Sequence, residues 1–183
     1  MAFFGRNGLY TPSYKVAGDE VAVFETSKGT IRVRLDGEGA PIHVANFCEL
    51  AEKGFYDGLR FHRYVPGFVI QGGCPNTRGM SAEQVASGQP GPEGFPGTGG
   101  PGYSIRHEYD VNPRNSHEDG ALAMARSQSP DSAGSQFYFC LGPQHGLDDA
   151  YTVFGSTIEG LDVISRLRAG DLIESVKIEH AAA

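Results

Sequence analysis

The chain of 183 residues has no tryptophan, three cysteines and no long hydrophobic run. Cys48, Cys74 and Cys140 are odd in number, far apart and without C-x-x-C spacing, which argues against a disulfide framework and a zinc site. No apolar stretch approaches the ~18 residues of a membrane span, and the first six residues hold less than a secretory signal needs. We therefore expect a cytoplasmic protein with reduced thiols.

Basic residues are also scarce relative to acidic ones. Lys plus Arg is 15 and Asp plus Glu is 22, so the formal net charge is −7. A surface of this sign repels nucleic acid phosphates and anionic lipids, and we expect neither nucleic acid nor a membrane as a partner. The length suits one domain over residues 1–183, with residues 1–18 as an irregular, aromatic extension that includes Phe3, Phe4, Tyr10 and Tyr14.

Glycine and proline are abundant instead. The chain has 26 Gly and 11 Pro, above average usage but below the ~25 to 30% typical of low-complexity sequence. Of the 15 residues 88–102, 11 are Gly or Pro, so much of the excess lies in one long loop.

The order of short apolar segments predicts a mainly β protein. Alternation at Ile31, Val33 and Leu35 predicts a hairpin of strands 21–26 and 30–35, and Pro66-Gly67 predicts a turn between strands 59–65 and 68–71. Helical spacing predicts helices near 41–53 and 160–168. Further strands are expected at residues 121–125, 136–141, 152–154 and 173–178. This order favours an antiparallel α+β or barrel architecture over a doubly wound one.

The sequence argues against three common types of site. The run from Gly97 to Gly102 matches G-x-G-x-x-G, but it neither follows a predicted strand nor opens a helix, as nucleotide binding requires. Ser135 lacks the G-x-S-x-G turn of a serine hydrolase. The six histidines show no His-Glu-x-x-His spacing, which argues against a zinc hydrolase. No metal or organic cofactor is expected.

The segment 61–73, Phe-His-Arg-Tyr-Val-Pro-Gly-Phe-Val-Ile-Gln-Gly-Gly, holds the most informative polar residues. If the turn spans residues 66–68, Gln71 falls directly opposite Arg63 on the same sheet face. A guanidinium and an amide would then share an apolar surface. The alternative is a solvated arginine whose stem merely covers exposed apolar side chains.

Residues 61–73 resemble the signature of the cyclophilins, a family of peptidyl-prolyl cis/trans isomerases. Further similar motifs follow in the family's order at residues 97–100, 122–127, 132–138, 147–148 and 153–155, and the run Met124-Ala125-Arg126-Ser127 is similar to bacterial members. The resemblance covers about residues 21–178. It implies a closed eight-stranded antiparallel β-barrel capped by two α-helices, with the site on the outside of the barrel.

The same resemblance implies the site residues. It identifies Arg63 as the catalytic arginine, assisted by Gln71 and Phe68. The implied substrate-binding residues are His62, Val69, Ala125, Arg126, Gln136, Tyr138, Leu147 and Tyr151. The expected activity is isomerisation of X-Pro bonds in proline-containing peptides and unfolded protein segments, assisting protein folding, by a monomer. The alternative is a non-catalytic proline-peptide binding module or chaperone that uses the same groove.

Three departures from the family pattern stand out. Gly146 replaces a tryptophan that contacts cyclosporin in well-known members, so weaker cyclosporin binding is expected. Tyr138 replaces the commoner phenylalanine, and its hydroxyl must find a partner when the ring packs. Residues 74–96 form an insertion longer than the family's link, with one helical turn expected at 81–86. The insertion either adjusts which peptides enter the groove or is a tolerated surface loop.

Overall fold

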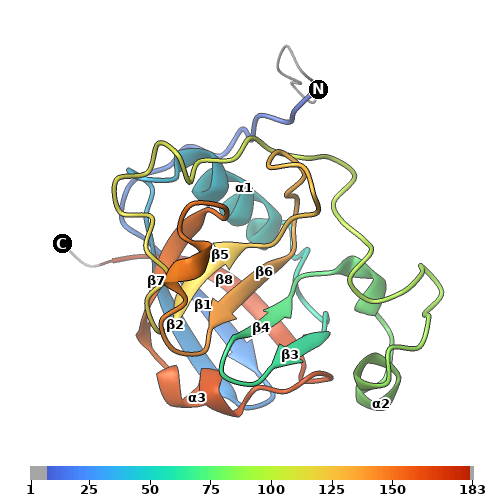
Figure 1. The fold of residues 1–183 in the computed structure, drawn as a ribbon. Helices are drawn as coiled ribbons and strands as arrows, with labels where there is room; N and C mark the ends of the chain where they lie inside the picture. The colour runs from blue at the N-terminus through green and yellow to red at the C-terminus, as the bar shows by residue number, and fades with distance from the viewer. Residues whose placement is uncertain (1–7, 182–183) are drawn as a thin grey trace.

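The computed structural model describes residues 8–181, and within them the chain forms one eight-stranded antiparallel sheet with the strand order β3-β4-β6-β5-β7-β2-β1-β8 (Figure 1). The strands are β1 (Glu20–Thr26), β2 (Gly29–Leu35), β3 (Arg63–Val65), β4 (Val69–Gly72), β5 (Ala121–Met124), β6 (Phe137–Cys140), β7 (Val153–Glu159) and β8 (Ile173–His180). The helices are α1 (Pro41–Glu52), α2 (Ala82–Ala86) and α3 (Leu161–Arg166), with 3-10 turns at Pro75–Thr77 and His145–Leu147. Both predicted hairpins are confirmed as β1–β2 and β3–β4.

The closed barrel implied by the resemblance is wrong, because the sheet is an open half-barrel whose edge strands are β3 and β8. The two edges approach where residues 58–61 meet residues 170–173. Backbone hydrogen bonds join these segments, but only Arg60 and Leu172 form a bridge pair. Gly58 and Gly170 lie at the ends of the contact with φ of +84° and +100°, a left-handed backbone that cannot continue a strand ladder.

The two predicted helices lie at opposite ends of the half-barrel, and a third lies outside it (Figure 1). Pro41 occupies the first turn of α1, where its missing N–H costs nothing, and α1 buries the predicted face that includes Val44 and Phe47. The short helix α2 confirms the helical turn expected at 81–86. Ser81 and Gln84 form a capping box at its start. No helix within residues 8–181 is long and apolar enough to cross a bilayer.

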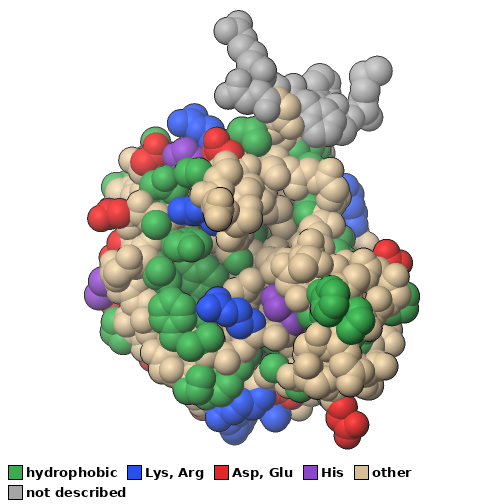
Figure 2. All heavy atoms as spheres, turned by 45° about the vertical axis from the view of Figure 1, so that its right-hand side comes forward, with side chains coloured by type: hydrophobic (Ala, Val, Ile, Leu, Met, Phe, Trp, Pro, Cys, Tyr) green, Lys and Arg blue, Asp and Glu red, His purple; other side chains and the backbone are tan. Residues whose placement is uncertain are grey.

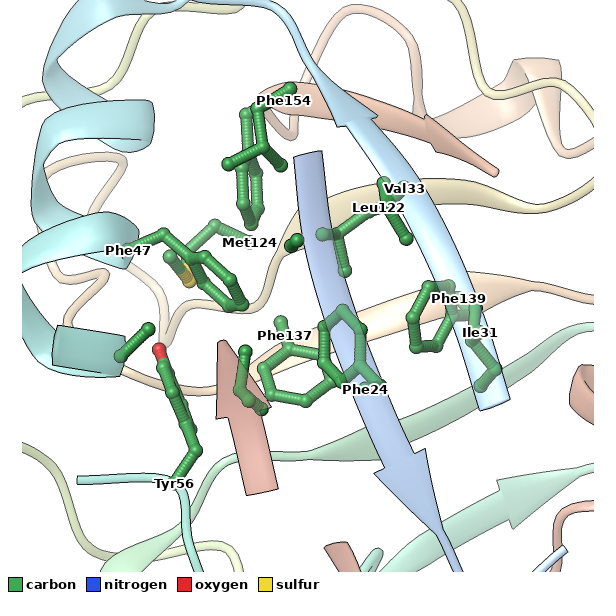
Figure 3. Close-up of a cluster of buried hydrophobic side chains, with 14 of the residues drawn as sticks. Phe24, Ile31, Val33, Phe47, Tyr56, Leu122, Met124, Phe137, Phe139 and Phe154 are labelled. Carbon is green, nitrogen blue, oxygen red and sulfur yellow. The ribbon is translucent and has the colours of Figure 1, made fainter. Parts of the chain in front are cut away.

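Strand alternation divides the side chains of the central strands between two faces. Phe137 and Phe139 of β6 point into the half-barrel and pack edge-on against Phe24 of β1, with ring centroids 5.5 Å and 5.2 Å away (Figure 3). Phe47 from α1 packs 6.0 Å from Phe137, so the helix and the sheet share one aromatic core. The intervening Tyr138 belongs to a second, smaller cluster on the outer face.

The described part of the N-terminal extension, from residue 8 onward, packs on the body of the protein. The Tyr10 N–H donates to Ser104 O at 2.8 Å, and the Tyr10 and Tyr103 rings lie 4.1 Å apart. Glu49 of α1 accepts hydrogen bonds from Ser13 N and Oγ at 2.9 Å and 2.6 Å. Phe3 and Phe4 lie outside the described residues.

The insertion at residues 74–96 is also packed against the body rather than extended into solvent. Arg60 donates to Met80 O and to Gly170 O, both at 2.8 Å, and so joins the insertion to the contact that links the two sheet edges. Met80 and Val85 are buried. Because its backbone and two apolar side chains are anchored, the insertion has a fixed position beside β3 and β4.

Candidate active site

A groove runs over the outer face of β4, β5 and β6. Figure 2 shows this side of the molecule, where hydrophobic side chains gather beside basic and histidine side chains. One pocket of the groove has a volume of about 650 Å³. Ten of the eleven site residues expected from the sequence line it: His62, Arg63, Phe68, Val69, Gln71, Ala125, Arg126, Tyr138, Leu147 and Tyr151.

The eleventh, Gln136, lines an adjoining pocket of about 670 Å³. The two pockets share five lining residues, so they form one continuous groove rather than separate sites. The shared residues are Gln71, Gly97, Thr98, Ala125 and Arg126. The structure therefore brings all the expected site residues together along this groove.

The guanidinium of Arg63 stands at one end of a chain of hydrogen bonds. Arg63 pairs with Gln71 across β3 and β4, as the turn geometry predicted, and Arg63 Nη1 donates to Gln71 Oε1 at 3.4 Å. Gln71 Nε2 in turn donates to Gln136 Oε1 at 3.0 Å. Arg63 itself is exposed, and this one long bond uses one of the five N–H donors of a guanidinium. The positive charge and the remaining N–H donors of Arg63 therefore face the groove.

The same chain of hydrogen bonds also holds the opposite wall of the groove, at Gly97 and Gly99. Gln136 Nε2 donates to Gly97 O and Gly99 O, both at 2.8 Å. From the other side, Gly97 N and Gly99 N donate to Cys74 Sγ at 3.2 Å and 3.3 Å. A side chain at Gly99 would lie 2.4 Å from Asn76 Oδ1, so the wall requires glycine there. Cys74 is buried and serves as a hydrogen-bond acceptor that holds the end of the insertion.

His62 lies in the groove beside Arg63 as a neutral imidazole. Burial, reinforced by the positive charge of Arg63, lowers the pKa of His62 to about 4. Its Nδ1 is buried and has no hydrogen-bond partner among the described residues. His62 Nε2 lies close enough to Gly97 that a Cβ there would approach it to 3.3 Å. Near neutral pH the arginine is therefore the cation at this end of the groove.

Arg126 and Tyr151 form the opposite rim. The Arg126 guanidinium carbon lies 4.6 Å from the centre of the Tyr151 ring, within range of a cation–π interaction. Arg126 Nε also donates to Ala150 O at 2.9 Å. Arg126 is therefore held at the rim by Tyr151 and Ala150. Among the described residues, Arg63 has one long side-chain hydrogen bond, to Gln71.

Tyr138 lies at the base of the pocket and is 4% exposed. Tyrosine in place of phenylalanine at this position requires a hydrogen-bond partner for its hydroxyl. His117 Nε2, 2.8 Å away, is that partner. The Tyr138 and Tyr151 rings meet edge-on with centroids 6.0 Å apart. Phe68, Val69 and Leu147 line the same pocket as further apolar walls.

Two contributions to the groove were missed in the sequence. Pro96, Gly97 and Thr98, where the insertion rejoins the body, line the pocket opposite the expected residues. The glycines at positions 97 and 99 indicated that other groups lie close to the backbone there, but the sequence did not show which residues those are. His117 was also missed, since a lone histidine in a loop carries no motif.

The fold and the external groove define a class of β-sheet protein with a preformed, partly apolar cleft and one presented cation. The family model described as cyclophilin type peptidyl-prolyl cis-trans isomerase/CLD matches residues 21–183. The chain belongs to this family, and the resemblance seen in residues 61–73 is confirmed.

Relatives agree with this assignment, and solved structures share the fold. The chain is 46% identical over 164 residues to a peptidyl-prolyl cis-trans isomerase of Synechococcus elongatus, covering 88% of this chain and 98% of the relative. It is 44% identical to peptidyl-prolyl cis-trans isomerase B of Bacillus subtilis, covering 81% and 90%. A cyclophilin-type isomerase of Cryptosporidium parvum, 22% identical, matches 89% of this chain and 99% of its own with a TM-score of 0.70. A second structure of that protein, with a TM-score of 0.66, was determined in the presence of the dipeptide Ala-Pro.

Proposed function

We propose that this protein is a peptidyl-prolyl cis/trans isomerase that accelerates rotation about X-Pro bonds in flexible or unfolded protein segments and so assists folding. The observation that carries the proposal is the pairing of Arg63 with Gln71 at the edge of an apolar pocket. The relatives that match over most of the chain bear the same activity in their names.

The reaction needs no nucleophile, because no covalent bond is broken. Rotation about a peptide bond has a barrier of ~18 to 20 kcal/mol, since the nitrogen shares its lone pair with the carbonyl. Uncatalysed prolyl isomerisation therefore takes tens of seconds or longer. In the twisted transition state the lone pair localises on the prolyl nitrogen. A fixed donor that hydrogen-bonds this lone pair stabilises the twisted state more than the planar one.

Arg63 is suited to be that donor. A guanidinium stays charged at any physiological pH and holds its N–H groups in a fixed plane. Gln71 limits the orientations of the guanidinium through its 3.4 Å contact, and Gln136 holds Gln71 in turn. The neutral His62 adds no competing charge beside it.

The pocket supplies the anchor against which the bond rotates. Phe68, Val69 and Leu147, with the ring of Tyr138, form the walls for the pyrrolidine ring of proline. Gln71, Ala125, Arg126 and Gln136 line the adjoining part of the groove, where the peptide backbone and flanking residues lie. One side of the prolyl bond is then held while the carbonyl side turns. A millisecond cycle needs a factor of ~10⁴, about 5 to 6 kcal/mol, which a charge-assisted hydrogen bond in an oriented site supplies.

The test is an isomerisation assay on a model X-Pro peptide with Arg63→Ala. We expect kcat/KM to fall by about 100-fold or more, the loss typical when one transition-state donor is removed. The control is Arg34→Ala, which removes an exposed arginine of β2 that lines a different pocket. Its kcat/KM should equal that of the wild type.

The same assay separates catalysis from binding alone. Peptide affinity of each variant is measured by NMR titration with Ala-Pro or the X-Pro peptide. A wild-type rate no faster than that of Arg63→Ala, with peptide binding retained, would establish the non-catalytic binding module or chaperone instead. A cation placed to face the prolyl nitrogen favours the isomerase, since binding the ring requires only the apolar walls.

Further properties stay predictions. Reduced, buried thiols at Cys48, Cys74 and Cys140 support a cytoplasmic location. We also propose a monomer with one catalytic domain, in which residues 1–18 are an extension and residues 74–96 an insertion. Cyclosporin is proposed to bind weakly, because Gly146 offers no side chain beside the pocket wall Leu147.

A further inference from the structure

A buried histidine lies directly behind the candidate proline pocket. His117 precedes β5, is fully buried and does not itself line the groove. Its Nε2 lies 2.8 Å from the Tyr138 hydroxyl, and its Nδ1 lies 2.8 Å from Asp148 Oδ1. Tyr138 is the base of the pocket, and Asp148 follows the wall residue Leu147 in sequence. His117 therefore connects two separate walls of one pocket.

The contacts fix which way each proton points. Asp148 Oδ1 also accepts the His117 backbone N–H at 2.7 Å, and Asp148 Oδ2 lies 3.0 Å from His145 Nδ1. These hydrogen bonds lower the pKa of Asp148 although burial opposes them, so it is a carboxylate and accepts only. The proton between Asp148 and His117 must then reside on His117 Nδ1.

The state of the other ring nitrogen follows. Burial lowers the pKa of His117 below its ordinary value in spite of the neighbouring Asp148, so the ring is neutral near pH 7. A neutral ring protonated at Nδ1 has an unprotonated Nε2, which accepts from Tyr138. The Tyr138 hydroxyl proton thus points away from the pocket. Tyr138 therefore turns no hydroxyl donor toward the space proposed to hold the proline ring.

The loop that carries His117 also holds the rim. Asn115 Nδ2 donates to Asp148 O at 2.6 Å and to Tyr151 O at 2.9 Å. Gln144 N donates to His117 O at 2.8 Å, just before the turn that carries Leu147. The Asn115 side chain and the His117 backbone therefore secure the rim, while the His117 side chain secures the base.

We infer that His117 is a positioning residue for isomerisation, which fixes the Tyr138 hydroxyl and holds the base of the pocket against the Leu147 wall. This inference rests on the proposed function, because it assumes that the proline ring enters this pocket. In a chain with phenylalanine at this position the hydroxyl would be absent and the link unnecessary. The contact with His117 thus gives a role to tyrosine at position 138, where phenylalanine is commoner in the family.

The first experiment uses the unmodified protein and needs no catalysis. The tautomer of His117 is read from ¹⁵N NMR of the imidazole at pH 7. We expect a proton on Nδ1 and an unprotonated Nε2, and we expect the Nε2 signal to shift when Ala-Pro is added. A proton on Nε2, or an Nε2 signal indifferent to saturating Ala-Pro, would overturn the inference even if the protein is an active isomerase.

The second experiment is a double-mutant cycle of His117→Gln and Tyr138→Phe. In the wild-type background, His117→Gln should raise KM about five-fold, the factor expected for one lost hydrogen bond, with a smaller change in kcat. In the Tyr138→Phe background the rise should be less than about two-fold, because the hydroxyl is already gone. Equal rises in both backgrounds would show a purely structural role.

The chain offers a matched control. His107 repeats the same local arrangement, with its backbone N–H and Nδ1 both directed at Asp131 Oδ1, at 3.0 Å and 2.7 Å. It does not line the groove. His107→Gln should therefore leave KM unchanged, and a rise equal to that of His117→Gln would contradict the inference. Thermal melting identifies any variant that fails to fold, in which case the tautomer measurement decides.

Discussion

The two faces of β4, β5 and β6 are built from the same strands but from different kinds of side chain. On the inner face, Ile70, Leu122, Met124, Phe137 and Phe139 are almost completely buried and carry no polar side-chain group. On the outer face the cluster contains Val69, Ala121, Ala123, Tyr138 and Cys140, bordered by partly buried Phe68, Ala125, Leu147 and Tyr151. One residue's shift along a strand changes a core position into a site position.

The two faces also differ in the size of their side chains. Ala121, Ala123 and Ala125 follow one another at every second position, and Ala123 pairs directly with Tyr138. Ala121 and Ala123 are buried, and Ala125 lines both pockets of the groove, whose larger walls include Phe68 and Leu147. The inner face is filled by large apolar side chains, whereas the outer face combines small, apolar and polar ones. We therefore expect inner substitutions to change stability and outer ones to change substrate or inhibitor binding.

The largest effect is expected for Phe137→Ala, which creates a cavity where Phe137 now contacts Phe24, Phe47 and Tyr56. Its free energy of unfolding should fall by about 3 to 5 kcal/mol, measured by urea denaturation. The kcat/KM of the folded protein should stay within about two-fold of the wild type, although both neighbours in sequence belong to the groove. A loss of kcat/KM as large as that of Arg63→Ala would contradict the view that the inner face determines stability and the outer face determines function.

A smaller effect is expected when bulk is added at the rim of the outer face. A Cβ at Gly146 meets no atom within 4 Å, and Gly146 is exposed. Gly146→Trp should therefore leave the free energy of unfolding unchanged while it adds an apolar face and an N–H donor beside Leu147. We expect cyclosporin to inhibit this variant about ten-fold more tightly, a gain of ~1.4 kcal/mol.

Isomerisation itself should persist in both proteins. The measurement is a cyclosporin titration of the isomerase activity of wild type and Gly146→Trp. Equal, tight inhibition of the two would show that the missing tryptophan has no bearing on the inhibitor. A large fall in the free energy of unfolding of Gly146→Trp would contradict the finding that the rim has space for a side chain at position 146.

Alternation made the two faces predictable from the sequence. The strand segments, both hairpins, the α1 and α3 regions and the pairing of Arg63 with Gln71 all follow from local spacing and turn residues. The motif at residues 61–73 predicted that Arg63 and Gln71 share a sheet face with apolar neighbours, a contact that is near in sequence. The rest of the groove, from Ala125 to Tyr151, was expected only from the resemblance to the cyclophilin family.

What sequence reasoning missed depends on contacts between distant loops. The open edge of the half-barrel is set by the meeting of residues 58–61 with residues 170–173, which no local pattern encodes. The need of Tyr138 for a hydrogen-bond partner was foreseeable, but its identity as His117 was not, since that residue lies in a loop 21 positions earlier. The same holds for Pro96 and Thr98, which reach the groove where Cys74, Asn76 and Gln136 hold the end of the insertion.

The smallest effect is expected in the insertion, which forms a wall beside the outer face. Phe95 is 56% exposed next to Pro96, which lines the pocket. Its backbone is fixed, because Phe95 O accepts from Asn76 Nδ2 at 3.0 Å and from Thr98 Oγ1 at 2.7 Å. We predict that this exposed ring, one residue from the groove lining, contacts an apolar residue that flanks the proline.

Phe95→Ala tests this contact more cleanly than removal of the insertion. Excision would also remove buried Val85 and the Arg60–Met80 hydrogen bond, and would confuse lost stability with lost selectivity. We expect kcat/KM to fall about two- to three-fold for X-Pro peptides with an apolar flanking residue and to stay unchanged for polar ones, with little change in unfolding free energy. Rates are compared across a peptide set that differs only at the flanking position. An unchanged ranking of the peptides would mean that the insertion is a tolerated surface loop, and that selectivity resides on the sheet face alone.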